Sequence, residues 1–295
     1  MLRASSSRVV GIALAVSGVL LGALPAAAET SAPKRSFRVT IDSTMILTGG
    51  DVEQTIKADT TMLYSRQRVG QTVTVWFDEV DVRAVSDGQV IVDTRMNRDR
   101  VVLVDNGVTR EVLADEAPAE VRQQLRDSFG GPLCEMTIDE DGIEGEARIL
   151  AGPGAKSLVD NGLISGTRLF HVRFPADARQ WDSANEVSMG SGAYARGTLH
   201  YEKVGPAAGG RTLVRVSGVL THDDSKVSGT GASSTGPSMR NVRYVVTGEQ
   251  VYDHTNREWA TGSLVMQIQL EYYSGEELLR HCHGTMSVQL ETLTR

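Results

Sequence analysis

The stretch from residue 263 to residue 291, SLVMQIQLEYYSGEELLRHCHGTMSVQLE, alternates apolar and polar residues more regularly than any other part of the chain. This period of two is typical of a strand with one buried face. Ser274-Gly275-Glu276-Glu277 is a turn signal, and the return strand carries Cys282 on its apolar parity and both His281 and His283 on its polar parity. The stretch therefore predicts a β-hairpin with one face in the core and one face in solvent.

Similar patterns predict strands over most of the chain. In the strand expected at residues 72–85, Val73, Val75 and Phe77 share one parity, whereas Val80 and Val82 share the other. A bulge near Asp78-Glu79 would restore the register and bend the sheet. Further strands are expected at residues 37–47, 56–64, 89–94, 133–138, 169–174, 197–204, 211–222 and 240–252.

Helical signals are few. Residues 117–129 carry Val121 and Leu125 four apart and end at Gly130-Gly131, which predicts one helix, and residues 154–161 are a candidate for a short helical turn. Strands without alternating helices favour antiparallel pairing. We expect a mainly β protein, a curved antiparallel meander sheet or a partly closed barrel with one or two short helices. Residues 223–239, rich in Ser, Gly and Thr, are expected to form a long loop.

The N-terminus has the pattern of a secretory signal peptide. Arg3 and Arg8 precede an apolar run over residues 9–24, and Pro25 with three alanines forms a small-residue cleavage site before Glu29. An uncleaved anchor is the alternative reading, and no later apolar stretch is long enough to span a bilayer. We expect an exported protein, periplasmic or extracellular, with residues 29–295 as a single β-rich domain. Two similar halves, at about residues 36–150 and 165–295, are the alternative.

Composition limits the possible partners. The formal net charge is −7, and residues 1–28 contain two arginines and no acidic residue, so their removal would make the chain more acidic. Nucleic acids and anionic lipid surfaces are therefore unsuited as partners. In an exported chain the two cysteines, Cys134 and Cys282, are expected to form a disulfide, with two buried free thiols as the alternative.

Few residues suggest chemistry. His281 and His283 point to the same side of a strand and are candidate metal ligands, but Thr285, Ser287 and Gln289 beside them favour an ordinary solvated face. Residues 139–144 lack EF-hand spacing, and residues 152–157 lack the order of a phosphate-binding loop. The sequence shows no nucleophile elbow, His-Glu-x-x-His or Cys-x-x-Cys motif. We therefore expect no cofactor, no metal and no enzymatic activity.

Aromatic residues suggest a binding surface instead. Trp76, Trp181 and Trp259 could line an apolar pocket in a curved sheet, although a place in the core is the favoured interpretation.

The middle of the chain resembles the DUF6263 family of uncharacterised exported bacterial proteins. The similar segments are LFHVRFP at residues 169–175, ADARQW at 176–181, TLHYE at 198–202 and GEQVYD at 248–253. The resemblance implies a secreted or periplasmic β-rich protein with no assigned activity. In outline, the bulged meander is also similar to bacterial lipoprotein-carrier folds, whose curved sheet cradles acyl chains.

These observations predict a non-catalytic exported binding protein with a concave apolar sheet face for a lipid-like or other apolar small-molecule ligand. A cell-envelope module that meets another protein through a sheet edge or through residues 223–239 is the second hypothesis. A hydrolase with an unrecognised catalytic site is the third.

Overall fold

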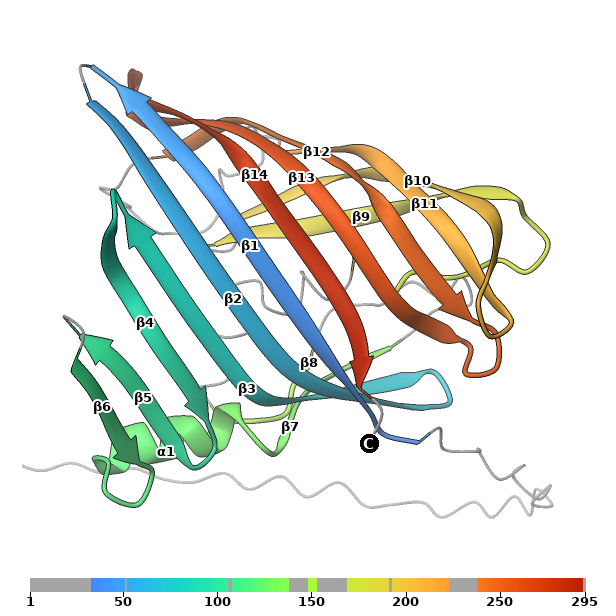
Figure 1. Ribbon diagram of the computed structural model, residues 1–295, viewed down its shortest axis with the longest axis horizontal. Coiled ribbons are helices and arrows are strands. Elements are labelled where there is room, and N and C mark those ends of the chain that lie inside the picture. Colours follow the sequence, from blue (N-terminus) through green and yellow to red (C-terminus); the bar gives the residue numbers. More distant parts are fainter. Residues whose placement is uncertain are drawn as a thin grey trace, which may run out of the picture. The chain divides into compact units, whose positions relative to one another are not determined.

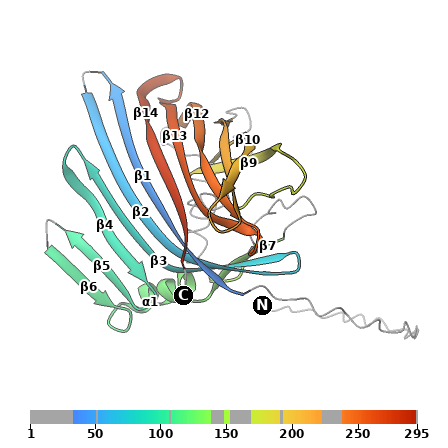
Figure 2. The same cartoon turned by 45° about the vertical axis from the view of Figure 1, so that its right-hand side comes forward.

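The computed structural model describes residues 33–50, 52–105, 108–137, 148–152, 169–190, 193–222 and 238–293. These residues form fourteen strands and one helix, and the strands belong to one antiparallel sheet. Its main path runs β6-β5-β4-β3-β2-β1-β14-β13-β12-β11-β10-β9, as Figure 1 shows. The sheet is curved and does not close (Figure 2), so the mainly β prediction is confirmed in its open-sheet form.

The strands are long for a globular protein. Their bounds are β1 (Arg35–Gly49), β2 (Val52–Val69), β3 (Thr72–Ser86), β4 (Gln89–Asn97), β5 (Arg100–Asp105), β6 (Val108–Leu113), β7 (Pro132–Thr137), β8 (Arg148–Ile149), β9 (Gln180–Gly190), β10 (Ala193–Ala207), β11 (Arg211–Thr221), β12 (Ser238–Asp253), β13 (Glu258–Ser274) and β14 (Glu277–Leu293), and the helix is α1 (Ala119–Ser128). The predicted signal peptide, the helical turn at 154–161, the acidic segment 139–144 and most of the loop 223–239 lie outside the described residues.

The predicted C-terminal hairpin is confirmed and lies in the middle of the sheet. β13 and β14 turn between Ser274 and Glu277, and Leu270 lies opposite Cys282. On its other side β14 pairs with β1 over thirteen residue pairs, from Ser36↔Leu293 to Thr48↔His281. β1 and β14, the first and last described strands in the sequence, therefore join the two meander runs into one continuous surface (Figure 1).

The predicted bulge in β3 is also confirmed. Tyr64 lies opposite Phe77 and Leu63 lies opposite Glu79, so Asp78 is the extra residue. The bulge coincides with a change of partner, because β3 pairs with β7 before it and with β4 after it. After the bulge the strand turns at Asp87 (φ 49°) and Gly88 (φ 83°), the left-handed pair expected of a type I′ hairpin.

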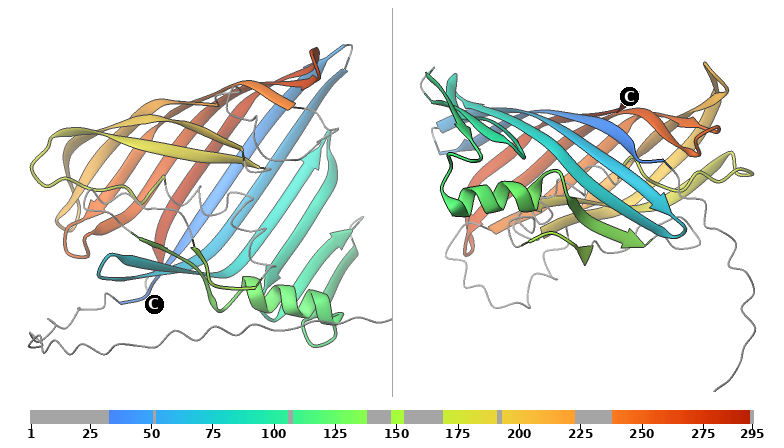
Figure 3. Two further views of the ribbon diagram at one scale, coloured as in Figure 1. Left: turned by 180° about the vertical axis from the view of Figure 1, so that it is seen from behind. Right: turned by 90° about the horizontal axis from the view of Figure 1, so that it is seen from below.

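The one described helix follows its sequence signals. Pro118 precedes it, Glu120 lies in its first turn and Arg126 in its last, which suits the helix dipole. Leu125 and Phe129 are buried in the same apolar cluster as Val75 of β3. The view from below in Figure 3 shows α1 and β7 beneath the arch of the sheet.

Glycines on one face of the sheet are matched with large apolar residues on the next strand. The pairs are Gly197 with Leu220, Gly218 with Leu199, Gly248 with Leu264, and Gly284 with Met45. At Gly248 an added Cβ would lie 2.1 Å from the Ser263 carbonyl oxygen and 2.9 Å from the Leu264 side chain. The large side chain thus lies over the glycine of the next strand. The two strands approach each other there too closely for any residue with a side chain to replace the glycine.

One predicted strand was wrong. Residues 169–174 alternate like a strand, yet they form no ladder and instead cross the strands as an extended segment. Four strands, β5, β6, β8 and β9, were not predicted. The sequence of β9, QWDSANEVSMG, lacks alternation and contains few residues that favour strands.

The glycine pairs give a direct test of the packing. We expect Gly248→Ala to lower the free energy of unfolding by about 3 kcal/mol, the upper end of the cost of inserting a methyl group into a packed site. Gly205→Ala on β10, where an added Cβ meets nothing within 4 Å, should change it by less than about 0.5 kcal/mol. Urea unfolding measures both, and equal stabilities of the two variants would contradict the packing described here.

Candidate apolar binding face

One face of the sheet carries most of its buried apolar side chains. We call it the inner face, and it includes Val39, Met62, Val80, Val288 and Leu264, all buried. Residues directly opposite each other in an antiparallel sheet share a face, so the register extends this assignment from strand to strand. The other face carries polar and charged residues such as His283 and Gln289 on β14, which are exposed.

Residues 169–176, which we call the strap, lie across the inner face at the end where β1 begins. Gln250 of β12 donates from Nε2 to the Leu169 carbonyl (2.9 Å), and Trp259 of β13 donates from Nε1 to the Val172 carbonyl (2.7 Å). Phe170 is fully buried over Gly262, where an added Cβ would lie 2.6 Å from its ring. The sheet therefore supplies the hydrogen bonds that a strap without a strand partner would otherwise lack.

An aromatic cluster holds the far end of the strap. The Phe174 ring stacks on Tyr252 with centroids 4.0 Å apart, and Trp181 and Trp259 pack edge-on against it. Lys203 of β10 donates from Nζ to the carbonyls of Pro175 (2.6 Å) and Ala176 (2.8 Å). These contacts anchor the strap to β10, β12 and β13.

His171 anchors the near end of the strap on the other half of the sheet. Its Nε2 lies 3.0 Å from the Tyr64 hydroxyl, and its ring meets those of Phe37 and Tyr64 edge-on. Loss of hydration, and then the charge of Arg66, hold the pKa of His171 well below its usual value. The imidazole is therefore neutral at neutral pH.

Beyond the strap, the residues that the structure describes leave the inner face of β1 to β5 partly exposed. One row of opposed residues runs Ile41, Thr60, Val82, Thr94 and Leu103 across five strands. Leu103 is 42% exposed, as is Val92 on β4, whereas Leu220 and Ile268 on the same face of β11 and β13 are buried. We call this surface the open apolar area; its apolar residues, each partly or fully exposed, are Ile41, Met45, Leu47, Ile56, Val82, Val92 and Leu103.

A row of polar side chains borders the open apolar area where β1 ends. Arg280 of β14 donates from Nη1 to Gln54 Oε1 of β2 (2.8 Å), and Gln54 donates from Nε2 to Ser86 Oγ of β3 (2.9 Å). Arg280 was missed in the sequence, although it precedes Cys282 by two positions and so has inner-face parity.

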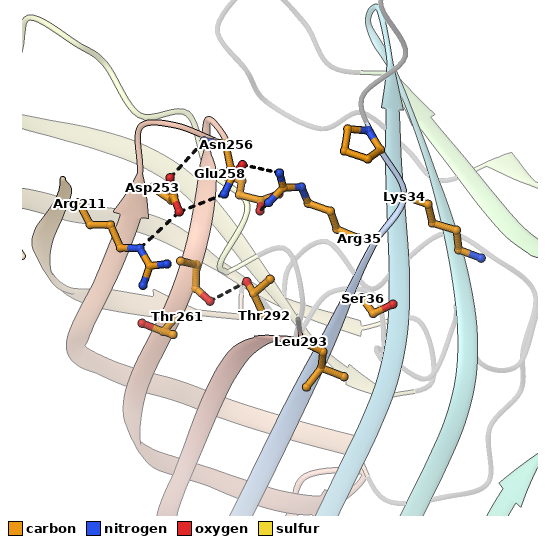
Figure 4. Close-up of a pocket in the computed structure, with 12 residues that line it drawn as sticks. Lys34, Arg35, Ser36, Arg211, Asp253, Asn256, Glu258, Thr261, Thr292 and Leu293 are labelled. Carbon is orange, nitrogen blue, oxygen red and sulfur yellow. Dashed lines mark hydrogen bonds and ion pairs between the residues drawn. The ribbon is translucent and has the colours of Figure 1, made fainter. Parts of the chain in front are cut away.

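A separate polar pocket of about 350 Å³ lies at the opposite end of the sheet (Figure 4). Arg35 binds Glu258, and Arg211 lies 3.3 Å from Asp253. Burial, with a smaller contribution from the charge of Asp253, leaves the pKa of Glu258 above its usual value although Arg35 lowers it. Burial also raises that of Asp253, but hydrogen bonds from Asn256 and Thr255 and the charge of Arg211 outweigh it and leave the pKa low. These charges are paired with each other, so we assign the pocket a structural role at the strand ends.

The three predicted tryptophans do not form one pocket. Trp181 and Trp259 meet around Phe174, but Trp76 has the opposite parity from buried Val75 and Phe77 and lies under the ammonium of Lys34, 4.3 Å from its ring centroid. The alternation around Trp76 could have excluded it from an inner-face pocket, because Val75 and Phe77 on either side of it point to the inner face.

His281 and His283 both lie exposed on the outer side of β14, as the parity predicted. His281 Nδ1 lies 3.2 Å from Glu271 Oε1 on β13. Within the described ranges no cluster of three or more His, Cys, Asp or Glu residues has the geometry to hold a metal ion.

The predicted disulfide is not present: Cys134 and Cys282 are both buried, but they are not bonded to each other. Both face inward, as predicted, but at opposite ends of the sheet. Cys134 lies level with Arg35 of β1 through Val75 and Arg66, whereas Cys282 lies opposite Leu47. Twelve residues of strand separate these levels, about 40 Å, far beyond the reach of a disulfide.

Comparison with known proteins gives little further information. No family model matches the chain, which leaves the resemblance to DUF6263 a prediction, and no curated protein matches it. A solved structure described as lipid-protein interactions in lipovitellin is similar with a TM-score of 0.46 and 9% identity, over 89% of this chain and 25% of that one. Similarity at this level transfers nothing to this chain. In the described part of the chain, no helix is long and apolar enough to cross a membrane.

The buried position of His171 predicts a pH dependence of stability. In the unfolded chain the imidazole takes up a proton as the pH falls below about 6.5, whereas in the folded chain it stays neutral. Protonation therefore favours the unfolded state, and between pH 7.5 and pH 5 the free energy of unfolding should fall by up to about 2 kcal/mol from this group.

His171→Gln should remove that part of the pH dependence, and His283→Gln, on the exposed outer face, should leave it in place. Urea unfolding of the three proteins at both pH values is the measurement. An unchanged pH dependence in His171→Gln would show that His171 does not carry it.

Proposed function

We propose that this is an exported, non-catalytic binding protein whose open apolar area holds a lipid-like ligand. The observation that carries the proposal is the uneven covering of one continuous apolar face. The strap and α1 cover one end, while the row from Ile41 to Leu103 stays partly exposed. Exposed contiguous apolar surface on the inside of a curved sheet is typical of a ligand site, since it is costly to leave in water without a function.

The export part of the proposal rests on the signal-peptide pattern of residues 1–28, which predicts a periplasmic or extracellular protein. In either compartment a free apolar ligand is poorly soluble, so a protein that covers it has a physical task. The polar outer face and the net charge of −7 suit a soluble carrier of this kind.

Native mass spectrometry of the protein expressed from its full sequence and purified without detergent tests the proposal. We expect an intact mass that starts at Glu29 together with a co-purifying apolar small molecule, or binding of added oleyl alcohol. A chain that carries no such molecule and binds no oleyl alcohol would contradict the binding function.

Matched surface variants locate the site. The double variant Leu47→Asn, Ile56→Asn, on β1 and β2 of the open apolar area, should weaken oleyl alcohol binding about tenfold, because each side chain loses apolar contact with the ligand. The control is Val219→Asn, Val265→Asn on the outer face of β11 and β13, where Val219 is 37% and Val265 is 41% exposed. Equal affinities of the two double variants would place the ligand elsewhere.

A further inference from the structure

We infer that the open apolar area takes an acyl-chain amphiphile with a carboxylate head group, a long-chain fatty acid, and that Arg280 binds the carboxylate. The inference rests on the proposed function, and it adds the chemical class of the ligand and its orientation on the sheet.

The position of Arg280 is set by the strands around it. Its side chain crosses β1 at Gly49, where an added Cβ would lie 3.0 Å from Arg280 Cγ and 3.3 Å from its Cα. An added Cβ would also lie 2.3 Å from the Leu279 carbonyl oxygen, so only a glycine fits here, and the Arg280 side chain passes over it to reach Gln54 on β2. The guanidinium is thereby held at the border of the open apolar area rather than extended into solvent.

Hydrogen bonds to neutral groups hold the arginine in place. Gln54 accepts from Arg280 Nη1, and its own amide donates to Ser86 Oγ, which directs the amide oxygen toward the arginine. The guanidinium has five N–H donors in a planar fork, and this contact uses one of them. The remaining donors are a suitable partner for a carboxylate, which binds such a fork through both oxygens.

The charge of Arg280 is not neutralised by the described part of the protein. Arginines elsewhere on the sheet, such as Arg35, Arg95 and Arg100, pair with glutamates, whereas no described carboxylate pairs with Arg280. Arg280 is also partly buried, which strengthens its attraction for an anion. A single guanidinium matches the single charge of a carboxylate.

The apolar surface starts beside the arginine and has the length of an acyl chain. Cys282 and Leu47 are opposed at the next inner-face position, followed by Met45 beside Ile56, then by Ser43 between Ala58 and Met286, and then by Ile41. From Leu47 to Ile41 the strand rises about 20 Å, close to the ~15 Å that one acyl chain occupies in half of a bilayer core. The strap begins beyond this point, where His171 contacts Phe37.

Two ligands that differ in the head group alone test the inference. Oleate and oleyl alcohol are titrated at pH 8 into the wild-type protein, Arg280→Gln, Arg280→Lys, and Arg243→Gln as an exposed control on the outer face of β12. We expect Arg280→Gln to weaken oleate binding at least tenfold and to leave oleyl alcohol binding unchanged, because a hydrogen-bonded ion pair is lost. Arg280→Lys should keep part of the affinity for oleate, and Arg243→Gln should match the wild type.

The outcomes separate this inference from the proposed function. If the wild type binds oleyl alcohol and Arg280→Gln binds oleate as tightly as the wild type does, the head-group site is wrong while the apolar site stands. A parallel loss of both ligands in Arg280→Gln would also overturn the head-group role. If the wild type binds neither ligand, the proposed function fails and the inference fails with it. Should Arg280→Gln not fold, equal affinity of the wild type for the two ligands would overturn the inference, and at least tenfold tighter binding of oleate would support it.

Discussion

The apolar inner face of a wide open sheet has to be removed from water, and the rest of the structure follows from how the chain meets this requirement. β1 and β14, far apart in sequence, join two meanders into one surface that neither could form alone. A sheet is stable when its apolar face packs against another layer. At one end α1, β7 and the strap form that layer, and at β1 to β5 the described residues leave the face partly exposed.

The shape of the inner face depends on side-chain size. Four glycines there are opposed by leucine or methionine, and the larger residue occupies the space over the smaller one. Gly262 provides room for Phe170 of the strap, and Gly49 provides room for Arg280. Glycine in a strand interior lowers stability. Its repeated use here indicates that the close packing it permits on the inner face stabilises the fold by more than the missing side chain would.

Alternation predicted the strands well but could not predict what lies across them. The hairpin of β13 and β14, the bulge at Asp78 and the helix all follow from local patterns of parity and punctuation. Residues 169–174 alternate for a different reason: Phe170 and Phe174 pack on β12 and β13, while His171 reaches β1 and β2. A period of two indicates that side chains point to alternate sides of an extended chain. It does not indicate whether that chain is hydrogen-bonded to a neighbouring strand.

The same limit explains the predictions about the site. The sequence correctly predicted that the side chains of Cys134 and Cys282 face inward. The distance between them depends on the order of strands in the sheet, and no local pattern of residues contains that order. Arg280 can be recognised as a candidate only when the alternation of β14 is followed past its apolar residues, which places Arg280 on the inner face, and when its contact with Gln54 is known. In contrast to the polar pocket around Arg35 and Arg211, whose charges are satisfied by each other, the border of the open apolar area leaves a charge for a ligand.

Photolabelling is the most direct test of the central claim that the inner face of β1 to β5 is the binding surface. A fatty acid with a diazirine near the end of its chain is irradiated with the full-length protein, and the labelled peptides are mapped by mass spectrometry. The account predicts labels on inner-face residues of β1, β2 and β3, such as Ile41 and Val82, that excess oleate removes. Labels on the outer face, for example at Val265, or at the polar pocket around Arg35, would contradict it.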